Sequence, residues 1–175
     1  TFGLFKAGVV PVLIDPGMGL KSLGKCLGEA SPHAFIGIPA AHAARKILGW
    51  AKESVKARVL VSGRLRLPGM KTLGDVRRKG SRVIAAAGGR VQLPENTLEQ
   101  VAAILFTSGS TGVPKGAVYT HAIFQAQIEN LRNLYGIEPG EIDLCTFPLF
   151  ALFAPSLGMT SIVPVMDPTR PARVN

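Results

Sequence analysis

The stretch Thr107-Ser108-Gly109-Ser110-Thr111-Gly112-Val113-Pro114-Lys115-Gly116 decides how this sequence folds, because it separates two apolar runs by a loop rich in hydroxyls and glycines. The runs at residues 101–106 and 117–120 both favour β-strands. Glycine lets the backbone approach a ligand closely, while serine and threonine supply hydrogen-bond donors that rotate to fit. Lys115 adds a positive charge on a flexible stem. A phosphate group can accept all these donors at once, so we predict a phosphate-binding loop between two strands.

Two other interpretations of the loop were weighed against this one. A P-loop of the NTPase type requires a glycine before the lysine and a hydroxyl residue after it. Pro114 and Gly116 occupy those two positions here, so the P-loop is rejected. A surface turn without a ligand is the other alternative, since turns rich in serine and glycine are common. The ordered, lysine-terminated form of this loop favours phosphate binding over a plain turn.

The same ten residues resemble the phosphate-binding signature of the adenylate-forming superfamily, which includes acyl-CoA synthetases, luciferases and peptide-synthetase adenylation domains. A second segment, Lys6-Ala-Gly-Val-Val-Pro11, is similar to an upstream motif of that superfamily. The resemblance implies an α/β fold, with a mostly parallel sheet and flanking helices, in part of the N-terminal domain of an adenylate-forming enzyme. It implies ATP and Mg²⁺ as cofactors and Lys115 as a catalytic residue. The residues implied to bind the ATP phosphates are Thr107, Ser108, Gly109, Ser110, Thr111, Gly112 and Lys115.

A third segment, Phe147-Pro-Leu-Phe150-Ala151-Leu-Phe153, resembles the Pro-Leu-Phe-His motif that lines the acyl pocket of many acyl-CoA synthetases. Ala151 stands where those enzymes have histidine, which leaves room for a bulky acid. The resemblance implies that Phe150 and Ala151 contact the substrate, and plain core packing is the alternative. Residues 125–140 and 146–171 are most similar to the olefin-pathway β-lactone synthetases of bacteria.

The resemblance implies ATP-dependent activation of a fatty or 3-hydroxy fatty carboxylate as an acyl-adenylate, with β-lactone closure as a further step. A fatty-acyl-CoA ligase or fatty-acyl-AMP ligase is the alternative within the superfamily. The implied partners are a small-molecule carboxylate and other enzymes of the same pathway, and the oligomeric state stays open. Members of the superfamily are longer and carry metal-binding, ribose-binding and C-terminal catalytic segments. We therefore expect this chain of 175 residues to be an incomplete domain that is inactive alone.

Positive charge is concentrated in residues 45–82, which hold 12 basic residues against two acidic ones, Glu53 and Asp75, in a chain of net charge +9. A basic nucleic-acid-binding or phosphate-binding module is therefore the alternative from another class. Trp50 is the only aromatic residue in that stretch, which leaves no platform for stacking bases. We expect a solvated basic surface and no nucleic-acid partner, because net charge governs solubility more than function.

The two cysteines predict the redox compartment of the protein, and the long uncharged run raises the question of a membrane span. Cys26 and Cys145 lie far apart without metal-ligand spacing, so we expect no zinc site, no metal ligand among the site residues, no disulfide and a reducing, cytoplasmic location. Residues 144–166 contain no charge and reach the length of a membrane span. We expect no transmembrane span but a strand, a turn and a short helix, because helix-breaking residues interrupt the run: Pro148, Pro155, Gly158 and Pro164.

Strand and helix patterns alternate along the chain, which favours βαβ units. Strands are expected at 9–14, 34–38, 58–61, 101–106 and 117–120, with a marginal one at 83–86. Helices are expected at 20–30, 40–51, 73–78 and 124–135. We expect His121 to start the last helix and Gly136 to stop it. The expected organisation of the incomplete domain, 1–175, is a first αβ part at 1–87, a linker-like stretch at 88–100, and a part with the phosphate loop and acyl pocket at 101–175.

Overall fold

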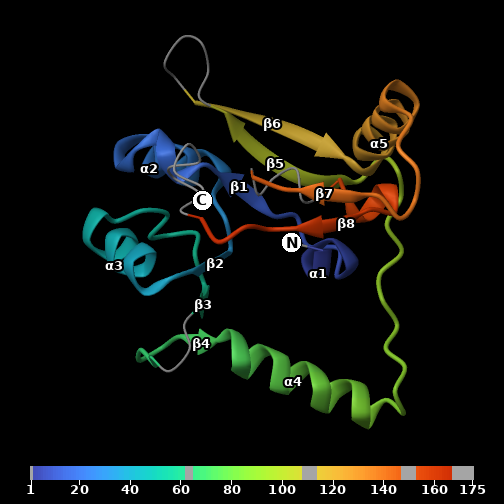
Figure 1. Ribbon diagram of the computed structural model, residues 1–175. Helices are drawn as coiled ribbons and strands as arrows, with labels where there is room; N and C mark the ends of the chain where they lie inside the picture. The colour runs from blue at the N-terminus through green and yellow to red at the C-terminus, as the bar shows by residue number, and fades with distance from the viewer. Residues whose placement is uncertain (1, 62–64, 108–113, 147–152, 167–175) are drawn as a thin grey trace. The chain divides into compact units, whose positions relative to one another are not determined.

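The computed structural model describes residues 2–61, 65–107, 114–146 and 153–166 (Figure 1). Two units share the chain: unit 1 comprises Thr1–Pro11, Glu95–Ile104 and Val118–Asn175, and unit 2 comprises Val12–Pro94 and Leu105–Ala117. Two strands, β5 (Val101–Thr107) and β6 (Lys115–Thr120), run from one unit into the other. Together with β1 (Val12–Ile14) they form a sheet of order β1-β5-β6. The domain boundaries expected from the sequence stay a prediction.

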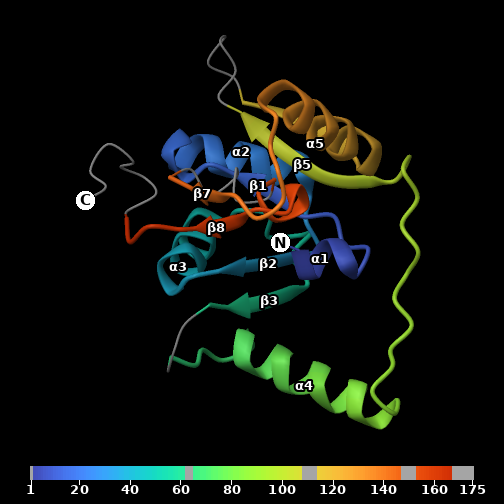
Figure 2. The same cartoon turned by 45° about the vertical axis from the view of Figure 1, so that its right-hand side comes forward.

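Unit 2 contains a parallel sheet, as the alternating pattern predicted, with one helix between its first two strands in sequence and a helix on either side of the three strands. Strand β2 (Ala34–Gly37) pairs with β3 (Ala57–Leu60), and β3 pairs with β4 (Lys71–Thr72). Figure 2 shows β2 and β3 running in the same direction. The remaining elements are a 3₁₀ turn, η1 (Pro16–Met18), and the helices α2 (Leu20–Ala30), α3 (Pro39–Leu48) and α4 (Leu73–Ala86).

A buried histidine joins helix α3 to the sheet of unit 2. His42 is 2% exposed, and its Nε2–H donates a hydrogen bond to the carbonyl oxygen of Val59 at 3.0 Å. Its ring meets Phe35 of β2 edge to face, with 5.1 Å between the ring centres. Leu60 and Cys26, in the same unit, are also almost fully buried. Buried polar groups are usually hydrogen-bonded, and the carbonyl of Val59 pairs the Nε2–H, while Nδ1 has no hydrogen-bond partner among the described residues.

Helix α4 is longer than the sequence predicted. The expected helix at 73–78 forms, but it continues to Ala86, so the marginal strand at 83–86 is wrong. Val83 and Ile84 favour strands because they are β-branched, yet that preference is weak where no neighbouring strand is available to pair. The helix is started by a capping box: the Asp75 amide donates to Thr72 Oγ1 at 3.1 Å, and the Thr72 amide donates to the Asp75 carboxylate at 2.9 Å.

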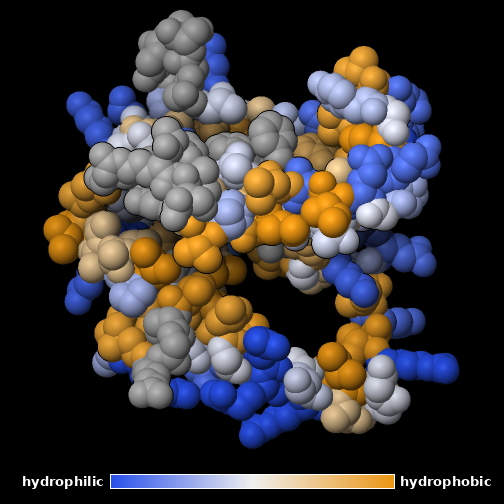
Figure 3. Space-filling view, viewed as in Figure 1, coloured by the Kyte–Doolittle hydropathy of each residue, from blue (hydrophilic) through white to orange (hydrophobic). Residues whose placement is uncertain are grey.

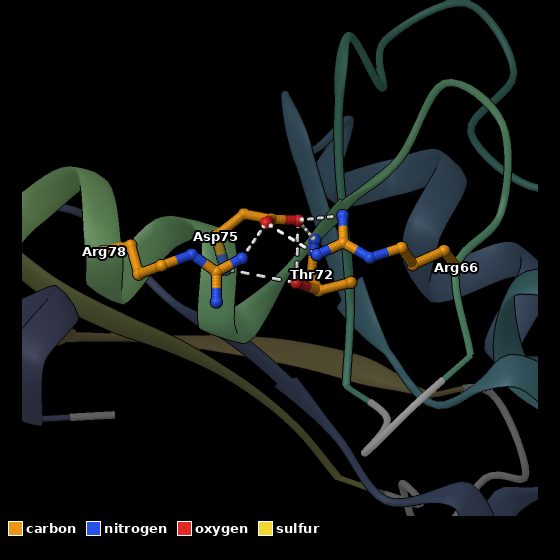
Figure 4. Close-up of polar contacts among 4 residues, drawn as sticks. All are labelled: Arg66, Thr72, Asp75 and Arg78. Carbon is orange, nitrogen blue, oxygen red and sulfur yellow. Dashed lines mark hydrogen bonds and ion pairs between the residues drawn. The ribbon is translucent and has the colours of Figure 1, made fainter.

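The Asp75 carboxylate also lies between two arginines (Figure 4). Arg66, from the segment before β4, contacts it at 3.3 Å, and Arg78, one turn along α4, donates a hydrogen bond to the same carboxylate. Hydrogen bonds from the amide and hydroxyl of Thr72, followed by the charges of Arg66 and Arg78, hold the pKa of Asp75 well below its usual range. This cluster stabilises the start of α4, and it pairs two of the 12 basic residues of the stretch 45–82 with an acidic residue.

Unit 1 contains the helix that the sequence predicts at 124–135. Helix α5 (His121–Tyr135) begins directly after β6, with the Thr120 hydroxyl accepting a hydrogen bond from the Ile123 amide at 3.3 Å. It ends at Gly136, whose φ of 63° is the left-handed conformation that glycine adopts without strain. The other elements of the unit are α1 (Phe2–Lys6), β7 (Ile142–Leu144), the 3₁₀ turn η3 (Pro155–Leu157) and β8 (Thr160–Ile162).

The uncharged run at 144–166 forms short elements, as expected. Strands β7 and β8 are parallel, with Leu144 opposite Ile162, and η3 lies between them in sequence. Ala154 and Leu157 are buried, whereas Val163 and Val165 are exposed, so burial of the run is only partial. In the part of the chain that the structure describes, no helix has both the length and the apolar character needed to cross a bilayer.

Candidate functional site

Strands β5 and β6 hold the two ends of the predicted phosphate loop. They are neighbours in their sheet, and the chain reverses its direction between them (Figure 1). Thr107 is the last residue of β5 and Lys115 is the first residue of β6, so the two strands expected on either side of the loop are confirmed. Phe106, directly before Thr107, is buried and anchors the end of its strand. The residues on either side of the loop are therefore both part of the sheet.

The side chains of Thr107 and Lys115 are both exposed. Lys115 has no ion pair with any residue that the structure describes, whereas Arg66 and Arg78 share Asp75. An exposed ammonium group without an acidic neighbour is available to an anionic ligand, and lysine suits a phosphate because its charge sits on a flexible stem. The two described members of the predicted site thus fit a phosphate ligand.

The other predicted site residues lie outside the described parts of the chain, and their roles stay predictions. These are the loop residues Ser108, Gly109, Ser110, Thr111 and Gly112 and the substrate-contact residues Phe150 and Ala151. Within the described residues, no group of three or more histidine, cysteine, aspartate or glutamate side chains could hold a metal ion. Magnesium at phosphate sites is usually held by one or two carboxylates together with substrate phosphates, so the Mg²⁺ that the resemblance implies stays a prediction and we assign no reaction step to it.

A cavity of about 400 Å³ lies within unit 1. This volume is within the range of small-molecule pockets, roughly 300–1,000 Å³. Its wall is mainly aromatic and aliphatic, with a few polar groups between, and the lining residues are Phe2, Phe5, Asn96, Leu98, His121, Phe124, Gln125, Ile128, Phe153 and Ser156. Such a lining can accept an aliphatic chain and contact a polar group at the same time.

Phe124 is the centre of the aromatic wall. Its ring centre lies 5.9 Å from that of Phe5, 6.0 Å from that of Phe153 and 5.1 Å from that of Tyr119. Rings at these separations stabilise one another by about 0.5–1.5 kcal/mol per pair beyond the area they bury. The wall is therefore held in shape by its own packing, which suits a preformed binding cavity.

Sequence reasoning found only part of this cavity. The sequence predicts a helix at 124–135, which includes Phe124 and Ile128, and places Phe153 in the acyl-pocket motif. His121 was expected to start α5, which it does, but it also lines the cavity, as does Gln125 one turn later. Spacing of three and four residues along 121–128 is the signal that could have grouped them on one helix face.

Solved structures share this fold. The anthranilate CoA ligase AuaEII in complex with anthranoyl-AMP matches 94% of this chain and 32% of its own, with a TM-score of 0.76 and 16% identity. The apo structure of MbtA from Mycobacterium smegmatis matches 91% of this chain and 30% of its own, with a TM-score of 0.71 and 24% identity. These likenesses confirm the predicted α/β fold, that of part of an adenylate-forming enzyme's N-terminal domain.

Related sequences give a more specific comparison. The chain is 56% identical over 171 residues to an olefin beta-lactone synthetase from Xanthomonas campestris pv. campestris, covering 98% of this chain and 29% of that protein. It is 52% identical over 177 residues to an olefin beta-lactone synthetase from Stenotrophomonas maltophilia, covering 99% and 30%. The chain thus spans about 30% of the length of these curated relatives. The family model described as AMP-binding enzyme matches residues 1–165, so the chain belongs to the AMP-binding enzyme family.

Proposed function

We propose that this chain is part of an enzyme that uses ATP to activate a fatty or 3-hydroxy fatty carboxylate and then closes the acyl group to a β-lactone. The observation that carries the adenylation step is Lys115, an exposed cation at the start of β6 that forms no ion pair with a described residue. The β-lactone step is supported by 56% and 52% identity to two olefin beta-lactone synthetases.

The proposed activation is a displacement at phosphorus. A carboxylate oxygen forms a bond to the α-phosphorus of ATP, the bond to the oxygen that bridges the β-phosphate breaks, and pyrophosphate leaves with that electron pair. Negative charge therefore builds on the leaving pyrophosphate. Lys115 and the hydroxyl and amide donors of the loop would hold that charge in a preorganised setting, which is the main way proteins accelerate phosphoryl chemistry.

The second step would use the substrate's own 3-hydroxyl group. Its oxygen bonds to the acyl carbon, the acyl–phosphate bond breaks, AMP leaves and the hydroxyl proton is released. The cavity of unit 1 is our candidate for the aliphatic part of the substrate, because its wall is apolar and includes Phe153 of the predicted acyl motif. His121 and Gln125, on α5, are two of the four polar residues of the lining that could contact a hydroxyl there.

A fatty-acyl-CoA ligase is the alternative, favoured by 39% identity over 64 residues to a long-chain-fatty-acid–CoA ligase from Salmonella typhimurium, which covers 35% of this chain. The two activities share the adenylation step and differ in the second nucleophile. Incubating the complete protein with ATP, a 2-alkyl-3-hydroxy acid and coenzyme A distinguishes them. A β-lactone as the product supports the proposal, and a thioester supports the alternative.

The adenylation step is tested by Lys115→Ala in the complete protein, measured as exchange of labelled pyrophosphate into ATP. A hydrogen bond to a charged group contributes about 1.5–3 kcal/mol, so the exchange rate should fall by roughly ten- to a hundredfold. Lys71→Ala is the matched control, because Lys71 is also an exposed strand lysine and lies in β4 of the same unit. Equal exchange rates in the two variants would contradict the role of Lys115.

We further propose that the enzyme works in the cytoplasm with other enzymes of the same pathway. Cys26 supports the location, since it is a buried free thiol and a reducing compartment preserves it.

A further inference from the structure

Helix α4 presents an apolar stripe to solvent. Four of its large apolar side chains are between 44% and 50% exposed, and none of its residues is buried; the four are Leu73, Val76, Val83 and Ile84. At the rotation of about 100° per residue in an α-helix, these positions fall within a stripe about 100° wide, the width typical of a helix face that meets an apolar medium. Nothing in the adenylation chemistry uses this stripe.

Basic side chains follow the rest of the helix surface. Helix α4 contains Arg77, Arg78, Lys79 and Arg82 against the single acid Asp75. Arg78 contacts Asp75, whereas Arg77, Lys79 and Arg82 have no ion pair with any described residue. Figure 3 shows hydrophilic side chains along α4 with hydrophobic ones beside them near its C-terminal end. The two kinds of side chain thus occupy one exposed helix.

We propose that α4 binds the surface of an anionic lipid bilayer, with its apolar stripe in the acyl boundary and its basic side chains at the headgroups. Interfacial helices have this composition: a strong separation of faces, low net hydrophobicity and lysine or arginine on the polar face. Arginine and lysine stems can lie along the apolar surface while their charges reach the phosphates. We choose an anionic bilayer as the partner of the apolar stripe because the basic side chains of α4 complement the negative charge of its lipids.

A nucleic acid would explain the cations but not the stripe. Proteins that bind nucleic-acid backbones use lysine and arginine, and those that hold single strands add aromatic side chains for stacking. Helix α4 contains no aromatic residue. Exposed valine, leucine and isoleucine side chains have no partner on a phosphate backbone, whereas a bilayer has a site for both faces.

The test uses the complete protein and co-sedimentation with vesicles of phosphatidylcholine that contain about one-third phosphatidylglycerol, compared with phosphatidylcholine alone. The protein should bind the anionic vesicles and lose that binding as salt is raised, because salt screens surface charge. The triple variant Arg77→Gln, Lys79→Gln, Arg82→Gln should bind about a hundredfold more weakly, since each basic residue contributes roughly fivefold at an anionic surface.

Two further variants separate the contributions. A control with the same loss of charge, on α2 and α3, is Lys21→Gln, Lys25→Gln, Lys46→Gln, and it should bind like the parent. The double variant Val83→Ser, Ile84→Ser keeps every charge and should bind roughly tenfold more weakly, because it removes apolar surface from the bilayer. Both side chains are about half exposed, so these changes should leave the fold intact.

The proposal is overturned if the complete protein does not bind anionic vesicles, or if the two charge variants bind them equally. It is also overturned if random duplex DNA displaces the vesicles while Val83→Ser, Ile84→Ser has no effect, which would assign the cations to nucleic acid. Amide hydrogen exchange of α4 must slow when vesicles are added; unchanged exchange would mean that another surface makes the contact. None of these measurements needs ATP, so their outcome is independent of the proposed adenylation.

Discussion

Replacing His42 with phenylalanine tests how unit 2 is held together. The His42 Nε2–H donates to the Val59 carbonyl at 3.0 Å, and the histidine is 2% exposed. Phenylalanine keeps a buried ring against Phe35 but cannot donate a hydrogen bond. A buried carbonyl that loses its donor costs about 1–3 kcal/mol, so we expect His42→Phe to lower the local free energy of opening by that amount.

The measurement is native-state hydrogen exchange at the Val61 amide, which donates to the carbonyl oxygen of Gly37 at 2.8 Å and so reports on the contact between the segments that carry β2 and β3. Hydrogen exchange measures the local opening of this segment. A global unfolding curve is less suitable, because a protein of several domains need not unfold in one step. The expected loss corresponds to roughly five- to hundredfold faster exchange. His42→Ala also leaves a cavity, and we expect a larger loss of about 3–5 kcal/mol.

His33→Phe is the matched control, because His33 is exposed in the same unit. Exposed substitutions usually change stability by less than about 0.5 kcal/mol, so its Val61 amide should exchange at the parent rate. If His42→Phe left that rate unchanged, or if both variants raised it equally, the hydrogen bond to Val59 would not be what fixes α3 to the sheet.

Three other predictions concern single groups. Gly24→Ala should destabilise the protein by about 1–3 kcal/mol in chemical denaturation, because the new methyl would lie 2.7 Å from Trp50 Nε1. Gly28→Ala, in the same helix but with no atom within 4 Å of such a methyl, should instead stabilise it by about 0.4–1 kcal/mol, and equal effects would contradict the packing argument. The pKa of Asp75 is lower in the folded than in the unfolded chain, so its stabilisation is complete above the unfolded pKa and is lost as pH falls through the folded one. Amide exchange in the first turn of α4 should accelerate in acid, and a variant Asp75→Asn that kept the same pH profile would refute this. Burial raises the pKa of the Cys26 thiol, so iodoacetamide should label it far more slowly in the folded than in the unfolded protein; equal labelling rates would exclude that burial.

Sequence patterns predicted the elements whose signals are local. Helix α2 repeats apolar residues at helical spacing and ends before Pro32, and α5 has the same repeat and ends at Gly136. The structure confirms both, and it confirms the parallel pair β2 and β3. Helix α1 was missed because five residues are too few to show a period, and β4 was missed because its two residues are defined by pairing with β3.

The candidate site also has one part with a local sequence signal and one part without it. The loop could be located from sequence because its residues are contiguous and flanked by apolar runs. The cavity could not, because its wall joins segments that are far apart in the chain: the Asn96 side chain donates a hydrogen bond to the carbonyl oxygen of Phe5 at 3.0 Å, across 91 residues. Such proximity arises from tertiary packing, which no local pattern encodes.

The direct junction between β6 and α5 limits how this part of the chain can change in evolution. The strand ends at Thr120 and the helix starts at His121, so no residue separates them. One inserted residue there would rotate the helix by about 100° and turn Phe124 and Ile128 off the aromatic wall. Length variation among relatives should therefore avoid this junction and accumulate at 88–94, where every residue is exposed and no helix or strand would be interrupted.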